Sequence, residues 1–257
     1  AASDVYKRQR LEDNMSTKSM TLYMVVPCYN EEEVLEETTK QLNVIFDGMK
    51  EAGKITEKSR ILYVNDGSRD QTWNLISKLH KENFWVSGLN LSRNRGHQNA
   101  VLAGLMYAKD HCDAAISMDA DLQDPPALLP EMLKMLETDE YDSVATRRVS
   151  RGGEPPIRSW FARRFYDIMN RISESDIVDG ARDFRLMKKS MVDAIVAMGE
   201  YNRFSKGLFG WVGFRTYWMP YENVERVAGE TKWNFWKLFK YAICLLYTSP
   251  SPRDTER

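Results

Sequence analysis

Two carboxylates, Asp119 and Asp121, stand one residue apart directly after the apolar run at residues 114–118. The run predicts a short buried strand, which the two prolines at positions 125 and 126 prevent from continuing. Gln123 offers a neutral oxygen close by. Mg²⁺ and Mn²⁺ prefer such oxygen ligands and often share their coordination with substrate phosphates. The segment therefore predicts a divalent-metal site, with a plain acidic surface turn as the alternative.

A second group of polar side chains follows the first apolar run of the chain. Pro27 ends that predicted strand, and Tyr29 offers an aromatic face to a nucleotide base. Asn30 and Glu31 can bond a base or a ribose. The helix expected next would turn its free N–H groups toward the same place. This segment suits a nucleotide, with an Asn helix cap followed by first-turn acids as the alternative.

The turn after the second apolar run carries Asp66 beside Gly67, which allows a tight change of direction. The Asp66 carboxylate can accept an N–H from uracil or guanine. A turn that leads into a helix capped by Asp70 is the alternative, and it leaves Asp66 unexplained.

The segment after the third apolar run brings two cations, Arg93 and Arg95, and Gly96 to the start of a predicted helix. Cations beside a helix N-terminus favour phosphate. His97 begins that helix, and we interpret it as a helix-cap or surface residue rather than a catalytic one.

The elements that must position these segments alternate between strand and helix. Apolar runs predict strands at residues 21–26, 60–65, 85–91 and 114–118. Helical periodicity predicts helices at residues 33–46, from about residue 70 onward, and at 97–108. This order predicts an α/β fold with a mostly parallel central sheet and helices on both faces. Ligands of such sheets bind at the carboxyl ends of the strands, where all four polar segments fall.

Taken in order, the motifs V-P-C-Y-N-E, V-N-D-G-S-x-D, R-N-x-G and D-A-D-L-Q-D-P resemble those of the family 2 inverting glycosyltransferases. These enzymes have the GT-A-type nucleotide-diphospho-sugar transferase fold. The polyprenyl-phosphate hexosyltransferases, including dolichol-phosphate mannosyltransferases and bactoprenol glucosyltransferases, are the group most resembled, over residues 21–241. The resemblance implies inverting transfer of a hexose from a UDP- or GDP-sugar to polyprenyl phosphate. It also implies Mg²⁺ or Mn²⁺ on the leaving diphosphate.

The polar segments and the resemblance together assign expected roles on the donor side. The residues expected to bind the nucleotide sugar are Pro27, Tyr29, Asn30, Glu31, Asp66, Arg95, Asp119, Arg226 and Lys232. The expected metal ligands are Asp119, Asp121 and Gln123, and the expected catalytic residues are Asp121 and Asp183. Arg226 and Lys232 belong to R-x-x-G-E-T-K, which we interpret as a mobile loop that reaches the donor phosphates. An interaction loop without a catalytic part is the alternative.

Arginines gather beside apolar and aromatic residues in the second half of the chain. Arg147 directly follows a predicted strand at residues 143–146. A helix expected from about residue 157 carries Arg158, Arg163 and Arg164. Arginine forks match phosphate oxygens, and the resemblance implies an acceptor phosphate held by Arg147 and one basic residue of that helix, with Arg163 preferred. A solvated basic helix face is the alternative.

Asp183 lies in a segment that resembles the family region bearing a third acidic residue, often written as the base position. A hydroxyl acceptor needs a base to remove its proton. A phosphate acceptor does not, because its second pKa is about 6 and it is an anion at neutral pH. We therefore expect Asp183 to orient or gate the acceptor. A structural role, either capping or pairing with Arg182 or Arg185, is the alternative.

The composition limits the classes of protein to which this chain can belong. Its 257 residues, 43% hydrophobic, allow one large α/β domain or two small ones, and its net charge of −1 gives no general attraction for nucleic acid. The three cysteines argue against a disulfide framework and for a reducing compartment. No G-x-G-x-x-G follows the first strand, which argues against a dinucleotide oxidoreductase.

We expect the chain to divide into a disordered or foreign leader at 1–19, a catalytic domain at 20–232, an amphipathic juxtamembrane helix at 233–246 and a disordered or foreign tail at 247–257. The helix mixes aromatics and lysines, which suits a membrane interface; packing on the domain is the alternative. We expect the enzyme at the cytoplasmic face of the membrane, anchored through a C-terminal segment that this sequence lacks. A homo-oligomer is left open. The rival functions are transfer to a saccharide hydroxyl and nucleotide-sugar binding without turnover.

Overall fold

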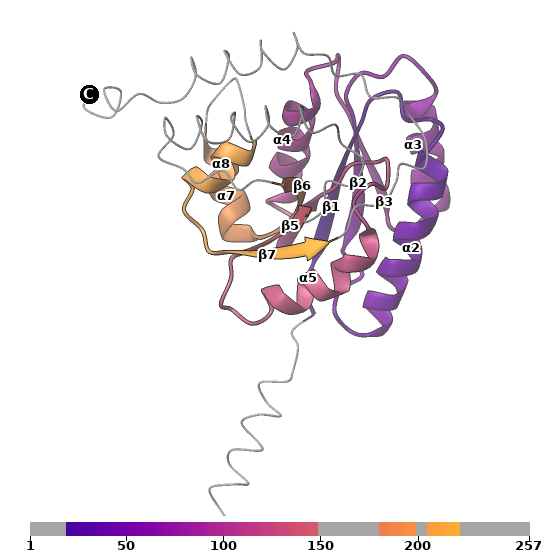
Figure 1. The fold of residues 1–257 in the computed structure, drawn as a ribbon. Coiled ribbons are helices and arrows are strands. Elements are labelled where there is room, and N and C mark those ends of the chain that lie inside the picture. The colour runs from indigo at the N-terminus through magenta and orange to yellow at the C-terminus, as the bar shows by residue number, and fades with distance from the viewer. Residues whose placement is uncertain (1–18, 149–179, 199–204, 222–257) are drawn as a thin grey trace, which may run out of the picture.

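The N-terminal half of the chain alternates between strands and helices around a twisted sheet (Figure 1). The computed structural model describes residues 19–148, 180–198 and 205–221. The elements of the first half are β1 (Leu22–Cys28), α2 (Leu35–Glu51), β2 (Arg60–Asn65), α3 (Thr72–Glu82), β3 (Val86–Asn90), α4 (His97–Ala108) and β4 (Ala114–Ser117). They are followed by the 3₁₀ turn η1 (Pro126–Leu128), α5 (Leu129–Leu136), β5 (Ser143–Arg148), β6 (Ala181–Lys188), α7 (Lys189–Ala197), α8 (Ser205–Trp211) and β7 (Thr216–Tyr221).

The seven strands form one mixed sheet in the order β3-β2-β1-β4-β6-β5-β7. Strands β3, β2, β1 and β4 are parallel, so their carboxyl ends lie at one edge. Strand β6 runs antiparallel to both β4 and β5. Its amino end, which carries Arg182 and Asp183, therefore arrives at the edge where the parallel strands end.

Both faces of the sheet are covered, which confirms the predicted fold class. Along β1, Leu22, Met24 and Val26 pack into a core beneath α2, α3 and α5. Tyr23 and Val25 point into a second core beneath α4 and α7. This alternation follows the two-residue period of a strand. A strand buried on both faces has no polar side, and so β1 appears in the sequence as a continuous apolar run.

The predicted strand at 60–65 and helix at 97–108 match β2 and α4 to the residue. The prediction that Pro27 ends the first strand is wrong, because β1 continues through Pro27 and Cys28, which pair with Val64 and Asn65. The proline is tolerated because β4 pairs with β1 only as far as Val25. Beyond that point the missing N–H of Pro27 has no strand on the β4 side to bond.

Gly104 lets α4 lie directly on the sheet. A Cβ at this position would overlap Val25 Cγ1 and lie 3.0 Å from Val64 Cγ2, two side chains in the core. Gly104→Ala is therefore expected to destabilise the fold by about 1–3 kcal/mol through overpacking, less the gain of about 1 kcal/mol in helix propensity. Urea unfolding measures the change. The matched control is Gly48→Ala in α2, where no atom lies within 4 Å; this variant should be neutral or more stable, and equal effects at the two sites would contradict the packing argument.

None of the helices in the described residues combines the length and the apolar composition needed to cross a bilayer. The expected leader before residue 19, the helix at 233–246 and the tail after it lie outside the described residues. The proposed division into these parts stays a prediction.

Candidate active site

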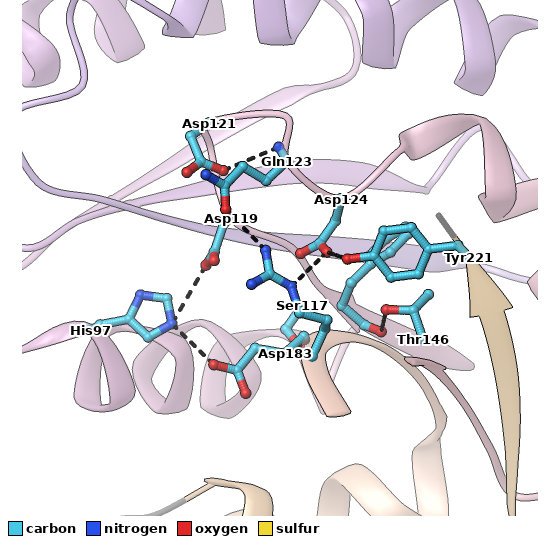
Figure 2. A network of polar contacts seen from close by, with 11 residues as sticks. His97, Ser117, Asp119, Asp121, Gln123, Asp124, Thr146, Asp183 and Tyr221 are labelled. Atoms are coloured by element: carbon cyan, nitrogen blue, oxygen red, sulfur yellow. Dashed lines mark hydrogen bonds and ion pairs between the residues drawn. The ribbon is translucent and has the colours of Figure 1, made fainter. Parts of the chain in front are cut away.

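The register of β4 against β6 brings two candidate acids together. Ser117 pairs with Arg185 in this antiparallel ladder. Asp119 lies two residues after Ser117 and Asp183 two residues before Arg185, so the two acids come opposite each other. The Ser117 hydroxyl donates to the Asp183 carbonyl oxygen and joins the two strands at this point. Asp119, from the D-x-D turn, and Asp183 therefore face the same space (Figure 2).

His97, the first residue of α4, lies between these two carboxylates (Figure 2). Its Nε2 is 3.6 Å from Asp119 Oδ1 and 3.8 Å from Asp183 Oδ2. The helix-cap or surface role predicted for His97 did not include this contact with two carboxylates. One sequence signal was available: His97 begins the helix that follows β3, so it had to lie at the edge where the other candidates lie.

Four carboxylates share this corner of the molecule. Burial raises the pKa of Asp119 to about 6, the charges of Asp183, Asp124 and Asp121 add to the rise, and His97 opposes it. The Asp119 side chain nevertheless keeps 37% of its surface exposed, so solvent and ligands reach it. Such a concentration of negative charge favours a divalent cation.

The donor set of this corner fits Mg²⁺ or Mn²⁺ shared with a substrate. Among the described residues, no group of three or more His, Cys, Asp or Glu side chains is arranged to hold a metal ion by itself. Mg²⁺ commonly takes one or two carboxylates and completes its shell with water and substrate phosphates. Asp119 and Asp121 supply that number of carboxylates.

The raised pKa predicts a pH-dependent effect on stability. Because the folded-state pKa of Asp119 is raised above its ordinary value, its contribution to stability is fully present below about pH 4 and lost as the pH rises through about 6. In EDTA, Asp119→Asn is therefore expected to unfold at a higher temperature than the parent protein above about pH 7. Thermal unfolding across the pH range measures the difference, which should vanish near about pH 4. A constant difference would contradict the assignment.

The residue directly after the D-x-D motif has an unusual backbone. Leu122 adopts φ +56°, a left-handed conformation that costs a non-glycine residue about 1–2 kcal/mol. Its side chain is buried in the core that α2, α3 and α5 cover, and this burial offsets the cost. Asp121 Oδ1 accepts a hydrogen bond from the backbone N–H of Gln123 at 3.2 Å, and this bond closes the turn. Strain of this kind is typical of sites where a precise direction of the side chains matters.

A buried polar cluster follows the turn and ties it to two other strands. Arg182 Nε donates to Asp124 Oδ1 at 3.0 Å, and one of its terminal nitrogens donates to Gln123 Oε1 at 3.2 Å. The Tyr221 hydroxyl donates to the same Asp124 oxygen at 2.7 Å. Arg182 thus pairs with Asp124 and not with Asp183, which corrects the expected alternative of an Asp183–Arg182 pair.

Arg185, the other expected partner of Asp183, also has different contacts. It is buried, donates to the hydroxyls of Ser143 and Thr216, and stacks between the rings of Phe209 and Trp218. Burial lowers the pKa of Arg185 to about 10, while Asp183 acts in the opposite direction. Arg185 therefore acts on Asp183 as a nearby charge and not as a hydrogen-bond partner.

The nucleotide-side segments bind one another. Asn30 adopts φ +55°. Its side-chain Oδ1 accepts a hydrogen bond from the backbone N–H of Arg69 at 2.9 Å, and its backbone N–H donates to Ser68 Oγ at 3.0 Å. Asp66 is 2% exposed, and its two oxygens accept the amides of Arg95 at 2.7 Å and Gly96 at 2.9 Å. These contacts hold the loops after β1, β2 and β3 together. The two backbone N–H groups account for the buried Asp66 carboxylate, so its position does not require a bound nucleotide base.

The remaining candidates lie around the same edge. Pro27 is buried in β1, whereas Tyr29 and Glu31 are half-buried just beyond it. Arg95 is exposed, and so is Arg147, near the carboxyl end of β5. The structure thus brings the described candidates to one end of the sheet. Arg163, Arg226 and Lys232 lie outside the described residues.

Comparison with known proteins agrees with this geometry. The family model described as "Glycosyl transferase family 2" matches residues 23–196. An uncharacterized glycosyltransferase from Synechocystis is 39% identical over 88% of this chain and 68% of its own length. A prophage bactoprenol glucosyl transferase homolog from Escherichia coli K12 is 36% identical over 87% of this chain and 70% of its own length. The chain thus spans about two thirds of the length of these relatives.

Among solved structures, a mannosyltransferase from Pyrobaculum calidifontis, in complex with GDP-Man and Mn²⁺, is similar with a TM-score of 0.58. The match covers 98% of this chain and 74% of that protein at 16% identity. A likeness at this identity supports the fold.

Proposed function

Because this chain belongs to glycosyl transferase family 2, we propose that it moves a hexose, with inversion, from a UDP- or GDP-sugar to a polyprenyl phosphate at a membrane surface. The family and the names of its relatives identify the chain as a glycosyltransferase. A relative named for bactoprenol supports a lipid carrier as the acceptor. The structural observation that carries the proposal is the approach of the D-x-D turn to Asp183 across His97.

On the donor side, Asp119 and Asp121 would hold Mg²⁺ or Mn²⁺. The metal, when bound, neutralises charge on the leaving diphosphate. Tyr29 and Glu31 lie beside the turn that Asn30 anchors, where a base and ribose would bind. Exposed Arg95 can meet a phosphate near the N-terminus of α4. Arg226 and Lys232 would add charge from outside the described residues.

On the acceptor side, Arg147 stands near the end of β5, beside the β6 strand that carries Asp183. It would hold the lipid phosphate together with Arg163. The phosphate is already an anion at neutral pH and can attack the sugar C1 from the face opposite the diphosphate without a base. The Asp183 side chain is 26% exposed and turns Oδ2 toward His97, so a group of the substrate can reach this carboxylate.

Asp183→Asn separates the two kinds of acceptor. With a lipid phosphate we expect the rate to fall by about tenfold or less, because no proton has to be removed. A hydroxyl acceptor would need Asp183 as a base, with a loss of roughly 10²- to 10⁴-fold. The measurement is the initial rate of nucleoside diphosphate release, with Asp193→Asn, an exposed acid of α7, as the control. A loss of about a thousandfold with the lipid acceptor would contradict the proposal.

A specific observation favours the hydroxyl acceptor as the second candidate function. His97 lies 3.8 Å from Asp183, and an imidazole beside a carboxylate is a common arrangement for moving a proton. In that case saccharide acceptors would support turnover and polyprenyl phosphate would not.

The test of the proposed function is release of nucleoside diphosphate from a panel of UDP- and GDP-sugars. It is run with Mg²⁺ or Mn²⁺, with and without undecaprenyl phosphate, and with EDTA as the metal-free control. We expect release that needs both metal and lipid, and the active donor names the base and the sugar. Donor binding without lipid-dependent release would leave the nucleotide-sugar-binding alternative. Binding at the cytoplasmic face of the membrane belongs to the same proposal, and co-sedimentation with anionic vesicles tests it.

A further inference from the structure

Arg185 is a buried cation whose direct contacts are neutral. The residue is 3% exposed, and its Cζ lies 4.4 Å and 5.1 Å from the ring centroids of Phe209 and Trp218. The hydrogen-bond acceptors that the described residues offer it are the hydroxyls of Ser143 and Thr216. In the same part of the chain its Nε is buried without a hydrogen-bond partner. Burying a charge is costly unless an opposite charge compensates it, so neutral contacts alone do not account for Arg185.

The opposite charge is supplied by Asp183, the one carboxylate of β6. Side chains two residues apart on a strand point to the same face and lie about 7 Å apart along it. Phe184 and Leu186 lie in the core beneath α2, α3 and α5, whereas Met187 lies in the core beneath α4 and α7. Asp183 and Arg185 therefore share the face that α4 and α7 cover. The pKa of Arg185, about 10, leaves the guanidinium charged at neutral pH.

The other carboxylates of this corner have partners of their own in the proposed site. Arg182 pairs with Asp124 at 3.0 Å, and the D-x-D turn would hold the metal. Asp183 has the longer contact with His97 Nε2, at 3.8 Å. An acceptor phosphate would bring a second anion beside Asp183, and two anions repel each other. A buried cation behind Asp183 offsets this repulsion, and salt screens such a cation only weakly.

We infer that Arg185 is a positioning residue of the acceptor side: its buried charge offsets that of Asp183 and so allows an anionic acceptor to bind beside this carboxylate. Arg185 acts through Asp183 and through space, because a residue that is 3% exposed offers almost no surface to a substrate. The role in acceptor binding rests on the proposed function, whereas the charge pair itself does not.

The first experiment measures the charge pair without substrate. Urea unfolding compares the full chain with Arg185→Met, Asp183→Asn and the double variant. Arg185→Met loses the hydroxyl bonds and the ring contacts in both backgrounds, so these losses cancel in the cycle. The attraction between the two charges remains. Arg185→Met should therefore lower the folding equilibrium constant about tenfold more when Asp183 is present than when asparagine replaces it.

Lys188→Met is the matched control, because Lys188 is a cation of the same strand that pairs with Asp139. Its coupling to Asp183→Asn should stay below about twofold. Equal effects of Arg185→Met in the two backgrounds would overturn the inference. If Arg185→Met does not fold, Arg185→Gln takes its place with the same expected result, since it keeps an N–H donor and removes the charge.

The second experiment measures the KM for undecaprenyl phosphate and the KM for the donor separately. Arg185→Met leaves the charge of Asp183 without compensation, so it should raise the lipid KM about tenfold and keep the donor KM within about threefold of the parent value. Adding Asp183→Asn restores the net charge and should return the lipid KM to within about threefold of the parent value. A merely structural Arg185 would give no such recovery. A lipid KM that stays high in the double variant would therefore contradict the inference.

Arg185→Lys separates charge from shape. Lysine keeps the positive charge but lacks the planar fork that lies between the two rings. The lipid KM of Arg185→Lys should stay within about threefold of the parent value. A rise equal to that of Arg185→Met would mean that shape decides, and the inference would fall. If the parent protein shows no lipid-dependent release, the proposed function fails, and the unfolding cycle still decides whether Arg185 offsets Asp183.

Discussion

Asp121→Asn is expected to lower lipid-dependent release of nucleoside diphosphate by at least about 10²- to 10³-fold, the usual cost of removing one group that stabilises developing charge. Asp121 is partly exposed at the D-x-D turn, and its carboxylate is one of only two proposed for the metal. An asparagine oxygen binds Mg²⁺ or Mn²⁺ more weakly and brings no charge to offset the leaving diphosphate. The rate with saturating donor and lipid is the measurement.

The fold should survive this substitution. Asp121 Oδ1 accepts a hydrogen bond from the backbone N–H of Gln123, and an asparagine oxygen can accept the same bond. The unfolding temperature of Asp121→Asn should therefore equal that of the parent protein. Asp110→Asn, an exposed acid after α4, is the matched control and should keep full activity. Substantial activity in Asp121→Asn at a metal concentration that saturates the parent protein would remove Asp121 from the proposed site.

Gly67→Ala is expected to have the largest effect on stability together with a loss of activity. Gly67 adopts φ +64°, and an added Cβ would lie 2.5 Å from Asn94 N and 2.6 Å from Arg93 C. These are backbone atoms of the loop after β3, which cannot turn aside as a side chain can. We expect a loss of about 2–4 kcal/mol from left-handed strain and overpacking together, measured by urea unfolding.

The same substitution should weaken donor binding. Pushing the loop away stretches the bonds from the Arg95 and Gly96 amides to Asp66, which hold two of the nucleotide-side segments together. The control is Gly53→Ala, which has a similar φ of +67° with no atom within 4 Å and therefore carries the strain without the overlap. If the two variants lose the same free energy of unfolding, the overlap of the added Cβ with the loop after β3 does not contribute to the loss.

The parts of the fold that could be predicted are those with local patterns. Strand β2 and helix α4 matched to the residue because an apolar run or a helical stripe is complete within its own segment. The insertion of β6 between β4 and β5 was not predicted. Strand β6 pairs with β4 at a distance of about 70 positions along the chain, and no nearby residue signals such a pairing.

The candidate site divides in the same way. The position of the D-x-D turn and of Asp66 at the carboxyl ends of β4 and β2 could be predicted, because each directly follows an apolar run. The partners of those side chains were missed: Asn30 bonds a loop amide, Asp66 bonds two, and Gln123 meets Arg182. Each of these contacts depends on how separate loops come together in three dimensions, which spacing along the chain does not report.

The position of β6 has a consequence for the order in which the protein assembles. In the described sheet, β6 joins the parallel strands to β5 and β7, and β5 pairs with none of the strands β1 to β4. A ribosome completes β5 more than 30 residues before it completes β6, so β5 must wait for its neighbour. The pairing of β1, β2, β3 and β4 needs no residue after Ser117, whereas β5 can join this sheet only after β6 has been made. A nascent chain can therefore form the loops after β1, β2 and β3 first, and it brings Asp183 and the β5 edge to the sheet together.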